Sequence, residues 1–246
     1  MNHETRQKIH DHAIAQFPRE CCGLVVMTED GEQYRPCRNI AKTASEHFVM
    51  HPHDYADAED AGEIVCVVHS HPQASSEPSQ RDLVACEQGT VKWLIVAVWK
   101  EPGDEKPRVV SDHAFMPTGY EAPLIGREFS FGVLDCYTLI KDWYQRERSI
   151  TLPHFERRDE FWKDNGAKVD LYAQYEQAGF EEVADGTLQV GDIPLMQIRA
   201  EFANHAGVYI GNGQILHHMY GRLSTRDVYS RSYYQEVTRR VVRLKR

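Results

Sequence analysis

The chain has 246 residues, of which 41% are hydrophobic and 26% are charged, and its formal net charge is −9. This length and composition suit a globular protein of two domains, each able to bury a core of its own. The acidic balance argues against a general nucleic-acid binder, and no apolar run approaches the roughly 20 residues of a membrane-spanning helix.

The first half of the sequence alternates between helical and strand-like patterns. Its polar N-terminus lacks the apolar stretch of a secretory signal, so the six cysteines are expected to be mostly free thiols. The expected elements are, in order, a helix over 4–17, a buried strand in CCGLVVM, a turn and edge strand in GEQYRPCRNIA, a helix in HPHDYADAEDAG, a strand in EIVCVVHS, a helix in PSQRDLVACEQG and a strand in WLIVAVW. This alternation predicts an α/β or α+β domain.

Proline and glycine punctuate the segment KEPGDEKPRVVSDHAFMPTGYEAP and predict a boundary near residues 117–123. The predicted domains are therefore residues 1–117 and 118–246, the second of α+β class. Its expected elements are a helix in DCYTLIKDWYQRE, a charged irregular stretch to about residue 170, and strands in LQVGDIPLMQI, NHAGVYIGN, QILHHMY and EVTRRVVRL. Alternation in the basic last segment favours an edge strand with a solvated face over a binding patch.

Two histidines at the end of a predicted strand form the first candidate site. His69 and His71 are spaced i, i+2, so an extended strand points both side chains the same way. Imidazole nitrogens with a carboxylate from Asp82, at the start of the next helix, would give three ligands and leave a position open for water, as catalytic zinc requires. Glu20 is a candidate general base, and Ser79 a candidate donor to an oxyanion. The alternative is a surface loop in which Asp82 stabilises a helix N-terminus.

The extended pattern is more specific than the three ligands alone. His69-x-His71-Pro72, then Pro78-Ser79-x-x-Asp82, with Glu20 upstream, resembles the JAMM motif of the MPN (JAB, Mov34) metallopeptidases over about residues 1–115. The resemblance implies a cytidine-deaminase-like mixed sheet with helices. It also implies Zn²⁺ held by His69, His71 and Asp82, with Glu20 as base, Ser79 polarising the scissile carbonyl, and isopeptide bonds among the substrates.

A cysteine at a predicted helix start forms the second candidate site. Cys136 follows Asp135, and a helix N-terminus favours thiolate over thiol. His205 opens one predicted strand and His217 ends the next, with a Gly-Asn-Gly hairpin signal between them, so the two can come close. A cysteine nucleophile needs such a base and an orienting partner. The alternative is a cysteine that only packs, with His205 on a strand surface.

The residues around this second site also carry a resemblance. Asp135-Cys136, Gly191-Asp192 and the run from His205 to His217 are similar to the NlpC-type papain-like cysteine peptidases over about residues 123–235. The resemblance implies Cys136 as nucleophile, His205 as base and His217 as the third polar residue, with His218 as a competitor. Family substrates are peptidoglycan stem peptides at bonds involving D-glutamate and diaminopimelate. Tyr137 and Thr138 stand where the family usually has Ser-Gly.

The order of the two domains resembles the tail-assembly proteins of lambda-like phages. The resemblance implies assembly with other tail-tip proteins in the host cytoplasm, and peptidase activity toward peptidoglycan. Two alternatives are open. One is an assembly factor whose chemistry is dispensable, and the other is a protease that processes a ubiquitin-like tail protein.

Overall fold

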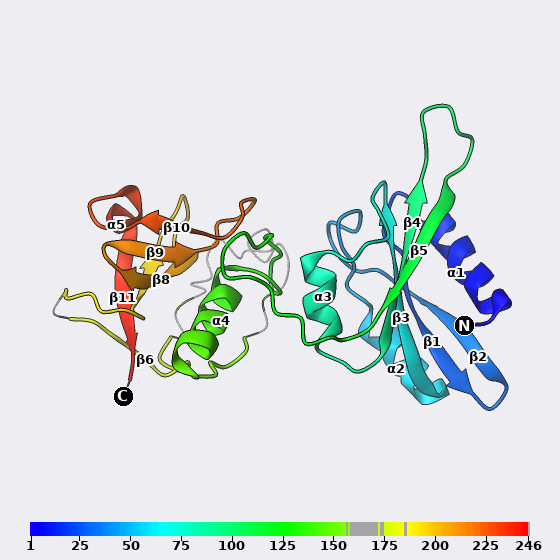
Figure 1. The fold of residues 1–246 in the computed structure, drawn as a ribbon, viewed down its shortest axis with the longest axis horizontal. Helices are drawn as coiled ribbons and strands as arrows, with labels where there is room; N and C mark the ends of the chain where they lie inside the picture. The colour runs from blue at the N-terminus through cyan, green and yellow to red at the C-terminus, as the bar shows by residue number, and fades with distance from the viewer. Residues whose placement is uncertain (156, 158–171, 173–174, 185, 246) are drawn as a thin grey trace. The chain divides into compact units, whose positions relative to one another are not determined.

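The chain folds into two compact units, residues 1–121 and 122–246 (Figure 1). The computed structural model describes all residues except 156, 158–171, 173–174, 185 and 246. Most of the predicted irregular stretch before residue 170 therefore lies outside the described residues. In the part of the chain that is described, no helix has the length and apolar character needed to cross a membrane. Both units mix helices with a sheet, which confirms the predicted fold class.

The N-terminal unit is built on one five-stranded sheet with the order β2-β1-β3-β4-β5. Only β3 and β4 run parallel, with α3 in the connection between them, and the other pairs are antiparallel. Its elements are α1 (His3–Gln16), β1 (Cys22–Thr28), β2 (Gly31–Cys37), α2 (Pro52–Ala61), β3 (Glu63–Pro72), α3 (Gln80–Cys86), β4 (Lys92–Trp99) and β5 (Arg108–Phe115).

Both faces of this sheet are covered. Val25 packs with Ile9 and Ala13 of α1, whereas Leu24, next to it on β1, packs with Ala58 of α2. Successive strand residues point to opposite faces, so a strand covered on both sides is apolar throughout. The continuous apolar runs in the sequence correspond to such strands.

Strand β5 is absent from the elements expected from the sequence. Proline and glycine in the segment 100–123 predict a boundary near residues 117–123 and no strand before it, but Arg108–Phe115 pairs antiparallel with β4. This strand lies at the edge of the sheet and contains only exposed and half-buried residues, with no regular alternation. Its polar centre, Ser111-Asp112-His113, gives a weak strand signal, and its pairing with β4 is a tertiary contact that local pattern does not reveal.

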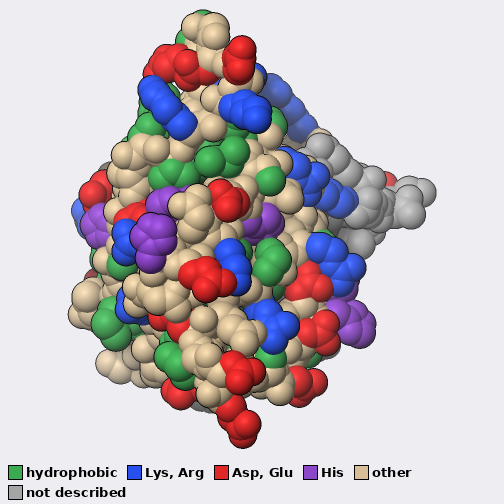
Figure 2. All heavy atoms as spheres, turned by 90° about the vertical axis from the view of Figure 1, so that its right-hand side faces the viewer, with side chains coloured by type: hydrophobic (Ala, Val, Ile, Leu, Met, Phe, Trp, Pro, Cys, Tyr) green, Lys and Arg blue, Asp and Glu red, His purple; other side chains and the backbone are tan. Residues whose placement is uncertain are grey.

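Mixed charge covers the molecular face drawn in Figure 2. Acidic and basic side chains are interspersed there without a patch of one sign. Ion pairs of the N-terminal unit include Arg6 with Asp112 at 3.0 Å and Arg38 with Asp54 at 2.6 Å. A face of mixed charge does not provide the continuous positive surface that binds the phosphate backbone of a nucleic acid.

The C-terminal unit holds a six-stranded antiparallel sheet with the order β10-β9-β8-β7-β11-β6. Helix α4 packs on it through Leu139, Ile140, Trp143 and Tyr144, which share a core with β7 and β8. The elements are α4 (Cys136–Arg148), β6 (Phe180–Glu182), β7 (Ile193–Met196), β8 (His205–Gly211), β9 (Gln214–His217), β10 (Thr225–Val228), α5 (Tyr233–Glu236) and β11 (Thr238–Leu244).

The prediction that the basic C-terminal segment is an edge strand is wrong. Strand β11 lies between β7 and β6, and Val242 pairs with both Ile193 and Glu182. The covering strand β6 has only three residues, too few to give a pattern of its own in the sequence. The exposed arginines of β11 fit the solvated face that was predicted.

Candidate functional site

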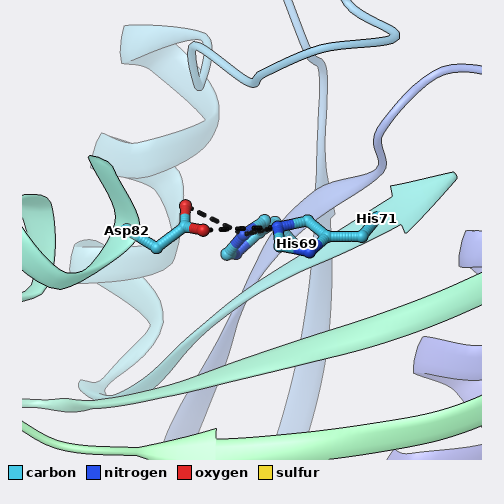
Figure 3. A group of neighbouring side chains, drawn as sticks. All are labelled: His69, His71 and Asp82. Carbon is cyan, nitrogen blue, oxygen red and sulfur yellow. Dashed lines mark hydrogen bonds and ion pairs between the residues drawn. The ribbon is translucent and has the colours of Figure 1, made fainter. Parts of the chain in front are cut away.

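The two histidines at the end of β3 converge as their spacing predicts. The Nε2 atoms of His69 and His71 lie 3.1 Å apart (Figure 3). His69 is fully buried, with its ring against Phe48 and Trp93 at centroid distances of 4.8 and 5.7 Å. These two aromatic rings were not anticipated, because nothing in their local sequence marks them as partners of a histidine.

Asp82 reaches both histidines from the first turn of α3. Its Oδ1 lies 3.2 Å from His69 Nε2, and its Oδ2 lies 3.3 Å from His71 Nε2 (Figure 3). Burial alone would raise the pKa of this carboxyl, but hydrogen bonds from His69, His71 and Ser79 hold it well below its usual range. Asp82 is therefore ionised and acts only as an acceptor.

Ser79 is the N-cap residue of α3 and forms a capping box with Asp82. Its backbone N–H donates to Asp82 Oδ2 at 2.8 Å, and its hydroxyl donates to the same oxygen at 2.7 Å. This arrangement fixes the carboxylate toward the histidines. To polarise a scissile carbonyl, the Ser79 hydroxyl would have to turn away from Asp82.

The three side chains form a donor set that fits a divalent transition-metal ion. Among the described residues, they are the group of His, Cys, Asp and Glu whose ligand atoms all lie within 4.8 Å of one another. Tetrahedral zinc with bonds of about 2.0–2.1 Å places ligand atoms about 3.3 Å apart, close to the 3.1–3.3 Å separations seen here. His71 Nδ1 contacts the carbonyl of Ser75 at 2.8 Å, which directs the Nε2 lone pair toward the other ligands.

Glu20 lies immediately before β1 and is buried. Burial raises the pKa of its carboxyl to about 8, and the charge of nearby His71 opposes that rise. The charges of Glu20, His71 and Asp82 influence one another, so the Glu20 carboxyl lies within electrostatic range of two of the potential ligands. A carboxyl that titrates near neutral pH can both accept and return a proton.

The remaining N-terminal histidines take structural partners. His10 contacts Asp112 at 3.0 Å, His12 contacts Tyr34 at 2.8 Å, and His51 caps α2 by accepting from the His53 backbone. His3 is exposed on α1. These four histidines therefore have structural partners or are solvated, and none of them joins the three potential metal ligands.

Cys136 is the first residue of α4 in the C-terminal unit. A capping box between Asp135 and Thr138 starts the helix there, and Arg157 holds the Asp135 carboxylate at 2.6 Å. The sulfur lies 3.1 Å from the Tyr172 hydroxyl and against the backbone of Ala206, the residue after His205. Arg157 and Tyr172 come from a charged segment whose sequence gives no sign of this proximity.

His205 and His217 meet across the β8–β9 hairpin, as their spacing predicts. His205 Nε2 lies 3.0 Å from His217 Nδ1, and both side chains are buried. His218 instead contacts the Arg222 carbonyl at 3.1 Å and the ring of Phe129 at 5.0 Å between centroids. The geometry therefore favours His217 over His218 as the partner of His205.

Gly207 leaves the space that His217 occupies, because the two residues pair directly across β8 and β9. A Cβ on Gly207 would lie 2.9 Å from both His217 Cβ and the Leu216 carbonyl oxygen. We expect Gly207→Ala to displace His217 and to lower the free energy of unfolding by about 1–3 kcal/mol. Thermal unfolding measures this effect. Gly89→Ala is the matched control, because its Cβ would meet no atom within 4 Å, and an equal loss in both variants would contradict the steric account.

The expectation that the helix N-terminus makes Cys136 a thiolate is not supported by its surroundings. Burial and the neighbouring Asp135 carboxylate raise the pKa of the Cys136 thiol to about 11. Burial, with the charges of His217 and His218, lowers the pKa of His205 to about 3. In the substrate-free protein the Cys136 thiol and the His205 imidazole are therefore both neutral, since desolvation outweighs the helix dipole.

This neutral pair predicts a distinctive pH dependence of alkylation. Because the thiol pKa lies above the assay range, the thiolate fraction and the rate of Cys136 modification by iodoacetamide should rise about tenfold per pH unit from pH 6 to 9. Mass spectrometry of the modified peptide measures the rate at Cys136 alone. A rate that is flat between pH 5 and 8 would instead indicate a preformed thiolate–imidazolium pair.

Two further residues extend the histidine pair. His217 Nε2 lies 3.0 Å from Asp227 Oδ2 on β10, and the Tyr234 hydroxyl donates to the same oxygen at 3.3 Å. Neither residue was anticipated from the sequence. His217 and Asp227 are ten residues apart in the sequence. They come into contact only because β9 and β10 pair.

Comparison with known proteins matches each unit to a family. The family model for prokaryotic homologs of the JAB domain covers residues 2–111, and the NlpC/P60 family model covers residues 126–243. The solution structure of protein DSY2949 from Desulfitobacterium hafniense is 25% identical and covers 44% of this chain and 78% of its own, with a TM-score of 0.35, too low to carry an argument.

Two curated relatives span both units. Tail tip assembly protein K of Escherichia phage N15 is 40% identical over 246 residues, which is 100% of this chain and 96% of that protein. Tail tip assembly protein K of Escherichia phage lambda is 35% identical over 181 residues, which is 74% of this chain and 82% of that protein. The chain therefore belongs to the family of the phage tail tip assembly protein K, with a JAB domain followed by an NlpC/P60 domain.

Proposed function

We propose that this protein takes part in phage tail-tip assembly and carries two peptidase centres, a metal centre in residues 1–117 and a cysteine centre in residues 118–246. Its partners are other tail-tip proteins, as the name of its relatives suggests, and it meets them in the host cytoplasm. The cysteine centre hydrolyses peptidoglycan stem peptides, and the metal centre hydrolyses a peptide or isopeptide bond. The observation that carries the proposal is that each unit gathers its own set of catalytic side-chain types.

In the cysteine centre, Cys136 is the nucleophile and His205 the general base. The sulfur attacks the scissile carbonyl carbon as its proton passes to His205, and the carbonyl π electrons move to the oxygen. The backbone N–H groups of Cys136 and Tyr137, which precede the Thr138 N–H that Asp135 caps, lack intrahelical acceptors and suit the developing oxyanion. The His205 imidazolium then returns the proton to the leaving amine, which breaks the C–N bond and leaves a thioester. Water activated by His205 hydrolyses the thioester and restores the thiol.

In the metal centre, His69, His71 and Asp82 would hold Zn²⁺, which supplies Lewis acidity when bound. Ser79 holds the Asp82 carboxylate in place through its hydroxyl and backbone N–H. Glu20 accepts a proton from the attacking water and delivers it to the leaving amine. The raised pKa of Glu20 suits it to both transfers, because neither its charged nor its neutral form is strongly disfavoured near neutral pH.

Purified muropeptides test the cysteine centre. Wild-type protein should produce fragments whose masses report a cut in the stem peptide, and the His69→Ala variant should produce the same fragments. Intact-mass analysis of a ubiquitin-like tail protein, with and without this protein and Zn²⁺, tests the metal centre. Wild-type protein that changes no mass in either assay would contradict the proposal.

A second candidate function is an assembly factor whose peptidase chemistry is dispensable. The Cys136 thiol has a raised pKa and contacts the Tyr172 hydroxyl, both of which favour an unreactive sulfur. Complementation of a phage that lacks this gene product separates the two functions. Full tail assembly by a folded Cys136→Ala, His69→Ala double variant would support the assembly role alone. Loss of assembly despite normal folding and partner binding would support a catalytic requirement.

A further inference from the structure

The histidine pair of the C-terminal unit is one part of a longer chain of contacts. His205 Nε2 lies 3.0 Å from His217 Nδ1, and His217 Nε2 lies 3.0 Å from Asp227 Oδ2. Tyr234 donates its hydroxyl to the same Asp227 oxygen at 3.3 Å, and its ring meets the His217 ring edge-on at a centroid distance of 4.6 Å. The buried imidazoles are thus linked to a carboxylate that is 42% exposed.

The hydrogen-bond donors and acceptors of these four side chains determine where the protons lie between them. An ionised carboxylate only accepts, so His217 Nε2 carries the proton that it shares with Asp227. Burial lowers the pKa of His217 and of His205, which keeps both rings neutral near pH 7 with one N–H each. His217 Nδ1 is then an acceptor, and His205 Nε2 must be the donor to it. The unprotonated atom of His205 is therefore Nδ1.

This proton arrangement matters for the proposed function of Cys136, on which the inference rests. The Nε2 atom of His205 is engaged by His217, so Nδ1 is the atom left to accept a proton. The opposite arrangement, with a proton on His217 Nδ1, would place the His205 proton on Nδ1 and block the base. Nothing in the His205–His217 pair alone distinguishes the two arrangements, because two neutral imidazoles can share a proton in either direction.

We propose that Asp227 is a positioning residue that selects the Nε2–H tautomers of His217 and His205, and that Tyr234 holds the Asp227 carboxylate for this purpose. The sheet supports this role. Thr225 pairs with His217 across β10 and β9, and Asp227 follows two residues later, on the same face of the strand. Arg226, between them, points to the opposite face and is exposed.

Long-range ¹H–¹⁵N NMR correlations on the full-length, ¹⁵N-histidine-labelled protein test the proposal without reference to activity. Single His205→Gln and His217→Gln variants assign the two rings. The wild-type protein should show the Nε2–H tautomer at both rings. Asp227→Ala should convert a measurable fraction of both rings to the Nδ1–H form, whereas Arg226→Ala, the control on the same strand, should not. Unchanged tautomers in folded Asp227→Ala would overturn the proposal.

Kinetics provide the second readout. Since Asp227 acts through His217 and is half-exposed, we expect Asp227→Ala to lower kcat for stem-peptide cleavage by about 10- to 100-fold, less than the loss of a residue in direct contact with the base. Asp227→Asn should retain more activity than the alanine variant, because its amide oxygen can still accept from His217. Tyr234→Phe should show a smaller loss than either. Equal kcat in all three variants and the wild type would contradict the positioning role.

The pH dependence of kcat distinguishes a positioning role of Asp227 from a loss of folding in the Asp227→Ala variant. The groups that act on the two histidines are Asp227, Arg222 and His218, together with the histidines themselves. Because the Asp227 carboxylate raises the pKa of His217, its removal should move the acidic limb of the kcat profile to lower pH. A uniform loss of rate with an unchanged profile would count against the proposal. Wild-type protein with the expected tautomers but no cleavage of muropeptides would contradict the proposed function and still support the tautomer assignment.

Discussion

The Cys136→Ala variant is expected to cleave stem peptides at least about 10³-fold more slowly than the wild-type protein. Alanine removes the proposed nucleophile at the start of α4, and His205 then has no thiol proton to accept. The rest of the centre should persist, because Asp135 and Thr138 cap the helix independently of the sulfur. Product formation under single-turnover conditions measures the loss.

A cysteine of the other unit provides the matched control. Cys86 is buried at the end of α3, far in sequence from residues 118–246, and its removal tests for general damage to the chain. Cys86→Ala should cleave stem peptides at the wild-type rate. Similar rates for Cys136→Ala and the wild type would show that the cleavage does not depend on this thiol.

Zinc binding is expected to stabilise the N-terminal unit, and the His69→Ala variant is expected to lose this stabilisation. A ligand present at 100 times its Kd stabilises the folded state by about 2.7 kcal/mol. The variant removes one of three ligands and should lower the affinity by at least about 100-fold, so that no comparable shift in Tm occurs at the same zinc concentration. Calorimetric unfolding with and without Zn²⁺ measures the difference.

Two further variants test whether the zinc response comes from this site. His3→Ala replaces an exposed histidine of the same unit and should respond to Zn²⁺ as the wild type does. Asp82→Asn, of nearly unchanged size, provides a second ligand variant in case the cavity at buried His69 prevents folding. An equal zinc response in the wild type and in both ligand variants would rule out this site.

The same site predicts how zinc affinity depends on pH. His71 must be neutral to bind a metal ion, and although burial lowers its pKa, the Asp82 carboxylate raises it above the ordinary value overall. Protons therefore compete with the ion below that raised pKa, and affinity should increase as pH rises through it. Isothermal titration calorimetry between pH 5.5 and 8 checks the direction.

Sequence reasoning succeeded where a residue's partner is fixed by local geometry. The i, i+2 spacing of His69 and His71 is sufficient to bring them together on an extended strand. The Gly-Asn-Gly turn brings His205 to His217 by closing a hairpin. In both cases the contact follows from a single strand or a single turn.

Sequence reasoning failed where the environment is made by distant segments. Asp227 and Tyr234 meet His217 only through the pairing of β9 with β10 and the packing of α5. The ionisation of Cys136 depends on burial by the surrounding chain, which a helix-dipole argument ignores. The interior position of β11 depends on β6, a strand too short to recognise in the sequence.

The most direct test of two independent peptidase centres is a product-mass comparison of four proteins in two assays. Wild-type, Cys136→Ala, His69→Ala and the double variant are each incubated with muropeptides, and with a ubiquitin-like tail protein and Zn²⁺. The account predicts that Cys136→Ala abolishes only the muropeptide products, and that His69→Ala abolishes only the change in the tail protein. Loss of both products in either single variant, or loss of neither in the double variant, would contradict it.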